Sequence, residues 1–177
     1  LAVEVHRLSG DDANVLYRFQ GTLQAAGWDS SAAGQPMPVD DIAAHLAEAF
    51  RSRGETALTD LHGRFAVAVV HPHTQEAWLA TDRFGIQGLY VRADHHGIAW
   101  STHLHALAGG TWLDPQALYD YVYFHCIPAP RTIYTGVYRL PAGHVLRWRP
   151  GHDAQLARYC RPDFAGDETP KIGRAHV

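Results

Sequence analysis

One short stretch, residues 64–70, constrains the fold of this chain more than any other. Successive side chains of a β-strand point to opposite faces, and here both faces are apolar. One face carries Phe65, Val67 and Val69, and the other carries Ala66, Ala68 and Val70. A strand with two apolar faces is covered on both sides, so we expect it at the centre of a sheet within a layered α+β domain.

Other β-rich stretches predict two hairpins and a meander around this strand. The expected strands are residues 3–8 and 14–20 for the first hairpin, 64–70, 76–81, 89–92 and 98–101 for an antiparallel meander, and 145–148 and 155–159 for a closing hairpin. Together with the helices described next, the order is strands, helix, strands, helix, strands. This order also favours the α+β class.

Two helices are predicted. Apolar residues recur at helical spacing over residues 39–50, and Gly54 supplies a C-terminal stop. Asp114-Pro115 combines a capping side chain with a proline at the first helical position, so a second helix begins there. We expect the aromatic side chains of this second helix to pack it against the sheet; they are Tyr119, Tyr121, Tyr123 and Phe124.

Charge and cysteine content exclude several classes of function. The formal net charge is -3 and the basic residues are dispersed, so neither nucleic acid nor an anionic membrane is indicated as a partner. No apolar run approaches the roughly 20 residues of a membrane span and no signal peptide is evident, so we expect a cytoplasmic protein. Cys126 and Cys160 lie far apart, and the histidine pairs 71/73 and 103/105 lack a third ligand nearby, so we expect no disulfide framework and no metal site.

The two ends of the chain need separate interpretation. The chain opens at Leu1 inside an alternating β pattern, which we interpret as an N-terminal truncation or a non-Met start. Residues 171–177 lack periodicity, and the last six correspond to a translated sequencing adapter. We therefore assign residues 1–164 to one partial domain and residues 165–177 to a linker and artefactual tail.

Three stretches resemble the class II glutamine amidotransferase domain of asparagine synthetases. L-H-G-R-F-A-V-A-V (residues 61–69) is similar to the family's L-x-G-x-F-A-F-A strand, and A-T-D-R-F-G-I-Q-G-L-Y (residues 80–90) to A-R-D-R-F-G-I-K-P-L-Y. P-A-P-R-T-I-Y-T-G-V-Y-R-L-P-A-G-H (residues 128–144) is similar, nearly residue for residue, to P-A-P-x-T-I-F-x-G-I-x-K-L-P-P-G-H. Purine-type amidotransferases lack this third segment, so the resemblance is to asparagine synthetases or their relatives.

The resemblance implies the four-layer αββα sandwich of N-terminal-nucleophile hydrolases, incomplete here at the N-terminus. In that family an N-terminal Cys attacks the side-chain amide of glutamine, and its own free α-amine acts as the base. We expect this nucleophile upstream of Leu1 and assign no catalytic residue within the chain. Cys126 and Cys160 are internal, and their amide nitrogens lack the basicity to activate a thiol, so we interpret them as structural.

The resemblance also assigns four residues to glutamine binding. Arg7 corresponds to the family Arg that holds the α-carboxylate; the alternative is a surface Arg paired with solvent. Gln20 and Gly21 correspond to the Asn and Gly of the oxyanion hole, although Gln20 is one methylene longer than Asn. Asp41 lies about one residue out of register with the Asp that binds the α-amine; the alternative is that Asp40 and Asp41 cap the helix.

As a whole the resemblance implies a glutamine-hydrolysing asparagine synthetase as the parent protein. Its partners would be glutamine and a C-terminal synthetase domain of the same chain, where ATP and magnesium support the amidation of aspartate; a homodimer is left open. The alternative is a degenerate, non-catalytic scaffold domain of an asparagine-synthetase-like enzyme of the β-lactam or lasso-peptide cyclising type. Gln20, Thr22 and the missing S-D-T-E segment favour this alternative.

Overall fold

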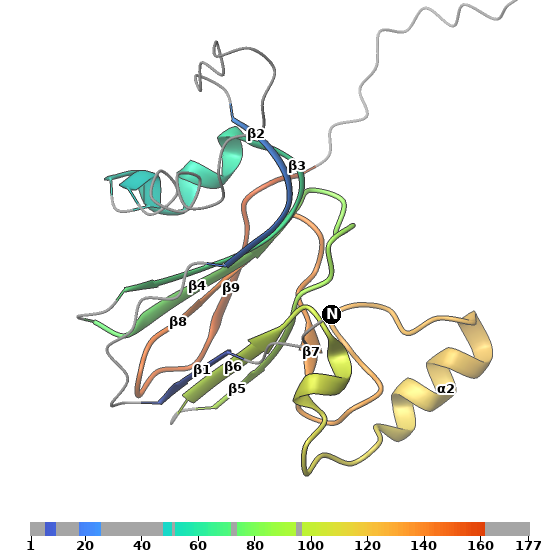
Figure 1. Cartoon of the computed structure of the whole chain (residues 1–177). Helices are drawn as coiled ribbons and strands as arrows, with labels where there is room; N and C mark the ends of the chain where they lie inside the picture. The colour runs from blue at the N-terminus through green and yellow to red at the C-terminus, as the bar shows by residue number, and fades with distance from the viewer. Residues whose placement is uncertain are drawn as a thin grey trace, which may run out of the picture.

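Two antiparallel sheets, stacked face to face, form the body of the domain (Figure 1). The computed structural model describes residues 6–9, 18–25, 48–50, 52–71, 74–94 and 97–161. The four-stranded sheet has the order β1-β6-β5-β7, with strands β1 (His6–Ser9), β5 (Tyr90–Ala93), β6 (Gly97–Ser101) and β7 (Tyr138–Arg139). The five-stranded sheet has the order β2-β3-β4-β8-β9, with strands β2 (Arg18–Ala25), β3 (Leu61–His71), β4 (Glu76–Thr81), β8 (His144–Trp148) and β9 (Gln155–Arg158).

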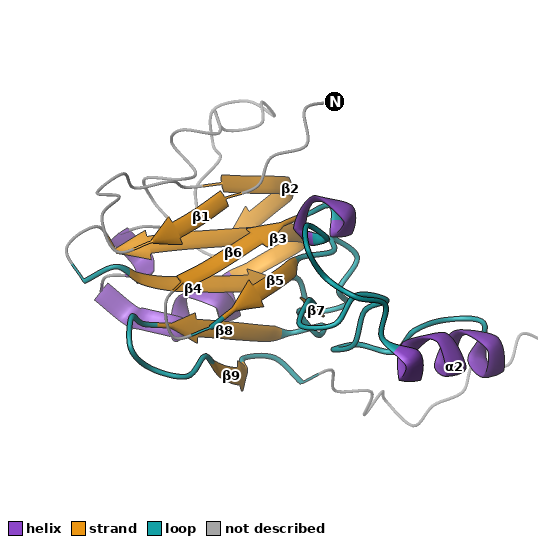
Figure 2. Cartoon of the chain, turned by 90° about the horizontal axis from the view of Figure 1, so that it is seen from below, coloured by secondary structure: helices purple, strands orange, loops and turns teal. Residues whose placement is uncertain are grey.

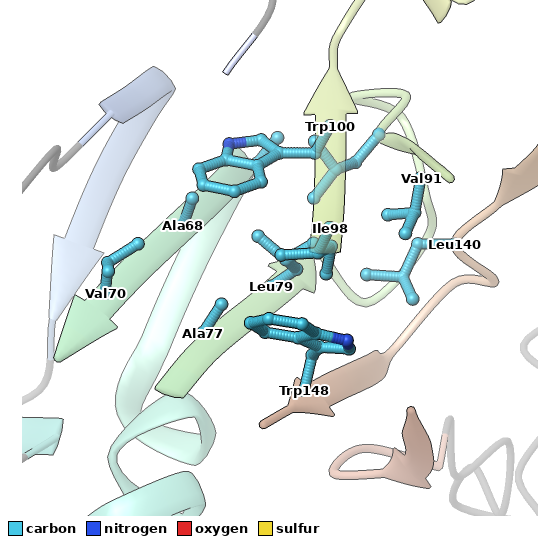
Figure 3. Close-up of a cluster of buried hydrophobic side chains, with 11 residues drawn as sticks. Ala68, Val70, Ala77, Leu79, Val91, Ile98, Trp100, Leu140 and Trp148 are labelled. Carbon is cyan, nitrogen blue, oxygen red and sulfur yellow. The ribbon is translucent and has the colours of Figure 1, made fainter. Parts of the chain in front are cut away.

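A continuous apolar core fills the space between the sheets (Figure 3). The five-stranded sheet contributes Leu79 and Trp148, and the four-stranded sheet contributes Ile98 and Trp100. Each of these side chains is almost fully buried, and large side chains gain most from removal from water. The inter-sheet core therefore fixes how the two sheets sit on each other.

Strand β3 is buried on both faces, as predicted. Ala66, Ala68 and Val70 belong to the core between the sheets. Phe65, Val67 and Val69 belong to a second core on the other face of the sheet, together with Phe50 and Leu58. The alternation along one strand thus divides its side chains between two cores, which confirms the central position predicted for it.

The second core lies under a helical layer. Residues 48–50 and 52–53 are helical, and the 3₁₀ helix η1 (Gly54–Asp60) follows directly. Gly54 has a left-handed φ of 60°, which fits the stop predicted for the helix over residues 39–50; the earlier part of that helix lies outside the described residues. A second 3₁₀ helix, η2 (Leu104–Leu107), follows β6. Stacked antiparallel sheets with helical segments confirm the α+β class.

Two of the predicted strand pairings are wrong. Strands β1 and β2 do not form a hairpin, because β1 pairs with β6 and β2 pairs with β3 in the other sheet. The predicted meander is also divided: β3 and β4 pair in one sheet, whereas β5 and β6 pair in the other. The closing hairpin of β8 and β9 is confirmed. Local patterns identified the strands, but the exchange between sheets depends on contacts far apart in sequence.

Helix α2 (Pro115–Phe124) projects from one end of the sheets (Figures 1 and 2). It begins as predicted, because the Asp114 side chain accepts hydrogen bonds from the backbone N–H groups of Gln116 and Ala117. The predicted packing of its aromatic residues on the sheet is wrong, since Tyr119, Tyr121, Tyr123 and Phe124 are all exposed. Within the described residues, no helix is long and apolar enough to cross a membrane.

Candidate functional site

The strands that carry Arg7, Gln20 and Gly21 lie at the same side of the two stacked sheets. β1 is the first strand of the four-stranded sheet and β2 the first strand of the five-stranded sheet, and Figure 2 shows both on the side opposite β9. The topology thus brings the Arg7 strand and the Gln20-Gly21 strand to one edge of the sandwich. Asp41 lies outside the described residues.

The strand register places these positions on defined faces. Gln20 is paired with Ala66 and Gly21 with Phe65, and Ala66 belongs to the core between the sheets. Directly paired residues of an antiparallel ladder share a face, so position 20 lies on the inter-sheet face of β2. Arg7 is paired with Ala99, which alternates with core residues, so position 7 lies on the outer face of β1. The glutamine-binding roles of these residues stay predictions.

The carboxylate of Asp82 organises the turn that follows β4. The carboxylate is completely buried and accepts hydrogen bonds from the backbone N–H groups of Phe84 at 3.0 Å, Ile86 at 3.1 Å and Gln87 at 2.9 Å. It also accepts from the N–H of Phe65 on β3 at 3.3 Å. Four backbone donors converge on one buried carboxylate, so the D-R-F-G-I stretch is a structural turn locked to the central strand.

The third motif stretch, residues 128–144, packs directly on this turn. The N–H of Gly143 donates to the carbonyl oxygen of Asp82 at 3.0 Å, and the guanidinium of Arg139 donates to the carbonyl oxygen of Gly85 at 3.1 Å. A side chain at position 85 would lie 3.2 Å from Cβ of Ala142, which shows how closely the two segments approach. The three motif stretches therefore form one connected scaffold, a shared structural role that their sequences alone do not indicate.

Tyr159 closes this scaffold from the C-terminal side. Its hydroxyl donates to the carbonyl oxygen of Thr81 at 2.6 Å, and its backbone N–H donates to the carbonyl oxygen of Gly143 at 3.0 Å. Burial raises the pKa of the Tyr159 phenol, because removal from water penalises the phenolate. The nearby Cys160 and Asp82 raise this pKa further. Tyr159 is thus a neutral hydrogen-bond donor rather than a proton-transfer group near neutral pH.

Neither cysteine has the surroundings that a catalytic nucleophile requires. Cys126 is exposed just after helix α2, so it is not a small buried residue; its interpretation as structural stays a prediction. Cys160 is half-buried, and its backbone N–H donates to the carbonyl oxygen of Gly143 at 3.2 Å. In both residues the nitrogen is an amide, which has no basicity with which to activate a thiol. Among the described residues, no group of three or more His, Cys, Asp or Glu is arranged to hold a metal ion.

A cavity of about 420 Å³ lies between helix α2 and the loop that follows it. Its walls include Asp120 and Phe124 from the helix and Arg131 and Tyr134 from the loop. The guanidinium of Arg131 is already paired, with Asp120 at 3.0 Å and with Asp114 at 3.2 Å. Among the described residues that line this cavity there is no cysteine, and the Arg131 guanidinium is already paired with acids of the same segment.

Comparison with known proteins identifies the class. Residues 30–160 match the family described as the glutamine amidotransferase domain, and this match covers well over half of the chain. The chain belongs to this family. All three motif stretches and the Asp82 turn lie within the matched residues, whereas Arg7, Gln20 and Gly21 precede them.

The curated relatives that this chain matches are named asparagine synthetases. A Mycobacterium tuberculosis protein, provisionally named a glutamine-hydrolysing asparagine synthetase, is 34% identical over 120 residues, which cover 63% of this chain and 18% of the relative. Asparagine synthetase 1 of Bacillus subtilis, also named as glutamine-hydrolysing, is 25% identical over 141 residues, which cover 78% of this chain and 22% of the relative. The chain spans about a fifth of the length of these curated relatives.

Two solved structures are similar to this chain at low sequence identity. One is the glutamine phosphoribosylpyrophosphate amidotransferase of B. subtilis, with a TM-score of 0.47 and 12% identity, covering 90% of this chain and 32% of that one. The other is described as the allosteric regulatory enzyme of purine biosynthesis, with a TM-score of 0.49 and 14% identity, covering 89% of this chain and 31% of that one.

Proposed function

We propose that this domain hydrolyses glutamine and supplies ammonia for the ATP-dependent amidation of aspartate in a longer polypeptide. The family match carries this proposal: residues 30–160 belong to the glutamine amidotransferase domain, and the relatives are named glutamine-hydrolysing asparagine synthetases. ATP and magnesium would then bind in the other domain of that polypeptide. The nucleophile would be an N-terminal Cys upstream of Leu1, since the two cysteines within the chain are internal.

The proposed glutamine site uses residues of β1 and β2, the two strands at one side of the stacked sheets, although the register places positions 7 and 20 on different faces. Gln20-Gly21 would supply a side-chain amide and a backbone N–H to the oxyanion formed during attack on glutamine. Arg7, on the neighbouring edge strand of the other sheet, would pair with the α-carboxylate of glutamine. Asp41 would bind the α-amine. The motif scaffold around Asp82 holds the central strand β3, against which β2 is paired over its whole length.

A second candidate function is a scaffold that has lost glutamine hydrolysis. Gln20 favours it, because β2 is held in register with β3, and an amide one methylene longer than Asn is displaced from the family's oxyanion position unless the backbone shifts. Under this proposal the longer polypeptide joins an amine other than ammonia to an activated carboxylate. The two candidates share the fold and differ in whether glutamine is bound and cleaved.

The gene sequence upstream and downstream of this segment distinguishes the two candidate functions with little experimental effort. Glutamine hydrolysis requires a Cys directly after an initiator Met, and synthetase activity requires a downstream S-G-G-L-D-S phosphate loop. A gene with the loop but without the Cys supports the scaffold. A gene without the loop contradicts ATP-dependent amidation altogether.

The full-length protein then gives the biochemical test. We expect glutamine-dependent formation of asparagine from aspartate with ATP and magnesium, together with covalent trapping of the N-terminal Cys by an electrophilic glutamine analogue. The variant Gln20→Asn should raise kcat for glutamine hydrolysis, by up to roughly a hundredfold, if the longer amide misplaces the oxyanion hole. Gln24→Asn, in the same strand, is the matched control and should leave kcat unchanged. Absence of any glutamine binding or trapping contradicts hydrolysis and leaves the scaffold.

A further inference from the structure

Helix α2 presents a large uncharged apolar surface, here called the α2 surface. Only Ala117 and Asp120 of the helix are buried. The remaining large side chains are exposed to between 43% and 75%, and they are Leu118, Tyr119, Tyr121, Val122, Tyr123 and Phe124. Because the single charged residue of the helix is the buried Asp120, the exposed part of α2 carries no charge.

The position of α2 is fixed by polar contacts rather than by packing on the core. The Arg131 guanidinium pairs with both Asp114 and Asp120, and the Gln116 side chain donates to Asp120 at 2.8 Å. Backbone bonds hold the start of the helix: the N–H of Asp114 donates to the carbonyl oxygen of Ile133 at 2.9 Å. These contacts are made by the polar residues of one side of the helix. The apolar side chains of α2 are exposed, and the helix itself projects away from both sheets (Figure 1).

The aromatic rings of the α2 surface are arranged before any partner arrives. Tyr119 and Tyr123 are stacked with ring centroids 6.1 Å apart, and Tyr123 meets Phe124 edge-on at 4.8 Å. Rigid aromatic side chains lose little entropy on binding, and tyrosine is enriched where an apolar body meets a polar tip at an interface. A helix that is apolar around most of its circumference is a buried helix in its native setting.

We propose that the α2 surface is the docking surface for the other domain of the longer synthetase polypeptide, an inference that rests on the proposed function. The matched segments make up 18% and 22% of the relatives, so about four-fifths of a protein of this kind is available to cover α2. A permanent contact within one polypeptide tolerates an uncharged, aromatic surface that a free domain exposes at the cost of solubility. The partner surface is expected to be apolar, with hydrogen-bond acceptors for the tyrosine hydroxyls.

The cavity beside α2 adds a second docking feature. The cavity, of about 420 Å³, is lined on one side by Phe124 and Tyr138, both more than half exposed. Its other wall is formed by the loop that carries Arg131 and Tyr134. Cavities next to a flat aromatic surface receive protruding side chains in tight interfaces. We expect one side chain of the other domain to enter it, and Arg131 to stay paired with Asp120 when it does.

Cysteine labelling in the native full-length protein tests the proposal without requiring activity. Val122→Cys places a thiol on the α2 surface, and Gln155→Cys places a matched thiol on the exposed strand β9. Reaction of each with a maleimide is followed site by site by mass spectrometry. We expect position 122 to react at least about tenfold more slowly than position 155, and equally fast after unfolding in urea. Equal rates in the native protein overturn the proposal.

Two further arms exclude other occupants of the surface. Protection that is unchanged over roughly a hundredfold dilution supports a contact within one polypeptide, whereas protection lost on dilution indicates a second copy of the chain and overturns the proposal. Protection that appears only when anionic phospholipid vesicles are added indicates a membrane surface and likewise overturns it. These rates do not depend on glutamine cleavage, so failure of the proposed hydrolysis, seen as no ammonia release, is distinguishable from failure of the docking proposal.

Discussion

Arg131 and Asp120 join the loop after helix α2 to the helix itself: the guanidinium lies 3.0 Å from the carboxylate, whose side chain is only 11% exposed. The same guanidinium lies 3.2 Å from Asp114, the N-cap of α2. One cation therefore bridges the first turn and the middle of a helix of ten residues. So short a helix is marginal alone, and this bridge substitutes for core packing.

Arg131→Met is expected to loosen helix α2 more than the sheets. The variant leaves the nearly buried Asp120 carboxylate without its cation, and we expect a loss of about 1 kcal/mol in the free energy of unfolding. Hydrogen exchange should accelerate in α2 amides and stay unchanged in β3 and β4. Arg131→Lys should be intermediate, because an ammonium cannot match the guanidinium geometry at two carboxylates. Arg158→Met, on exposed strand β9, is the control; an equal loss there would remove the special role of Arg131.

The local parts of this fold were predictable from sequence, and the long-range parts were not. The two apolar faces of residues 64–70 placed β3 at the centre of its sheet, and Asp114-Pro115 placed the start of α2, since each depends on adjacent residues. The sequence did not predict that β1 and β2 belong to different sheets, because their places depend on pairing with the distant strands β6 and β3. The sequence predicts that the aromatic residues of α2 pack on the sheet, because large apolar side chains are usually buried. In the part of the chain that the structure describes, these side chains are exposed to solvent.

The candidate site was predictable only through resemblance. Spacing alone does not mark Gln20 or Arg7, which lie in edge strands of different sheets, and only the topology brings these two strands to the same side of the sheets. Asp82 and Tyr159 carry no sequence signal for their contacts, because those partners are backbone groups on distant segments. The D-R-F-G-I motif pointed to Asp82 as a motif residue, but its structural role needed the geometry of the turn.

Asp82→Asn should be the most destabilising conservative change in the scaffold. Each carboxylate oxygen accepts from two backbone N–H groups, and an amide nitrogen in place of either oxygen would face two donors. We expect a loss of about 3 kcal/mol in the free energy of unfolding, measured by urea titration. Asp94→Asn is the matched control: Asp94 is exposed and accepts from the N–H of Gly97 at 2.9 Å, so its change should stay within about 0.5 kcal/mol. Similar losses at both positions would contradict the role assigned to Asp82.

Three glycine-to-alanine variants separate backbone strain from steric contact. Gly109 has open space around it, Gly110 has open space and a left-handed φ of 72°, and Gly143 has a φ of 66° with its new Cβ only 2.7 Å from the carbonyl oxygen of Cys160. Urea titration should give losses of about 0, 1 and at least 2 kcal/mol in that order. If Gly143→Ala left the free energy of unfolding unchanged, the chain after β9 would not pack tightly on the motif scaffold.

The raised pKa of Tyr159 predicts a specific loss of stability in alkali. An ordinary tyrosine ionises near pH 10, so above about pH 10 the unfolded chain releases a proton that the folded chain retains. The stabilisation contributed by this phenol is therefore complete below its unfolded pKa and falls as pH rises toward the folded pKa, by up to about 1.4 kcal/mol per pH unit. Tyr159→Phe lacks this dependence.

Urea titrations across the alkaline range test this prediction. Near neutral pH, Tyr159→Phe should be less stable than the wild type by about 1 kcal/mol, because it loses the hydrogen bond to the Thr81 carbonyl oxygen. Above about pH 10 this difference in the free energy of unfolding should shrink, since only the wild type loses stability as its unfolded state releases the Tyr159 proton. Tyr138→Phe, at a phenol that is more than half exposed, should show a constant difference across the range. A constant difference for Tyr159→Phe as well would mean that the Tyr159 phenol ionises equally in both states, and that burial does not hold it neutral within the scaffold.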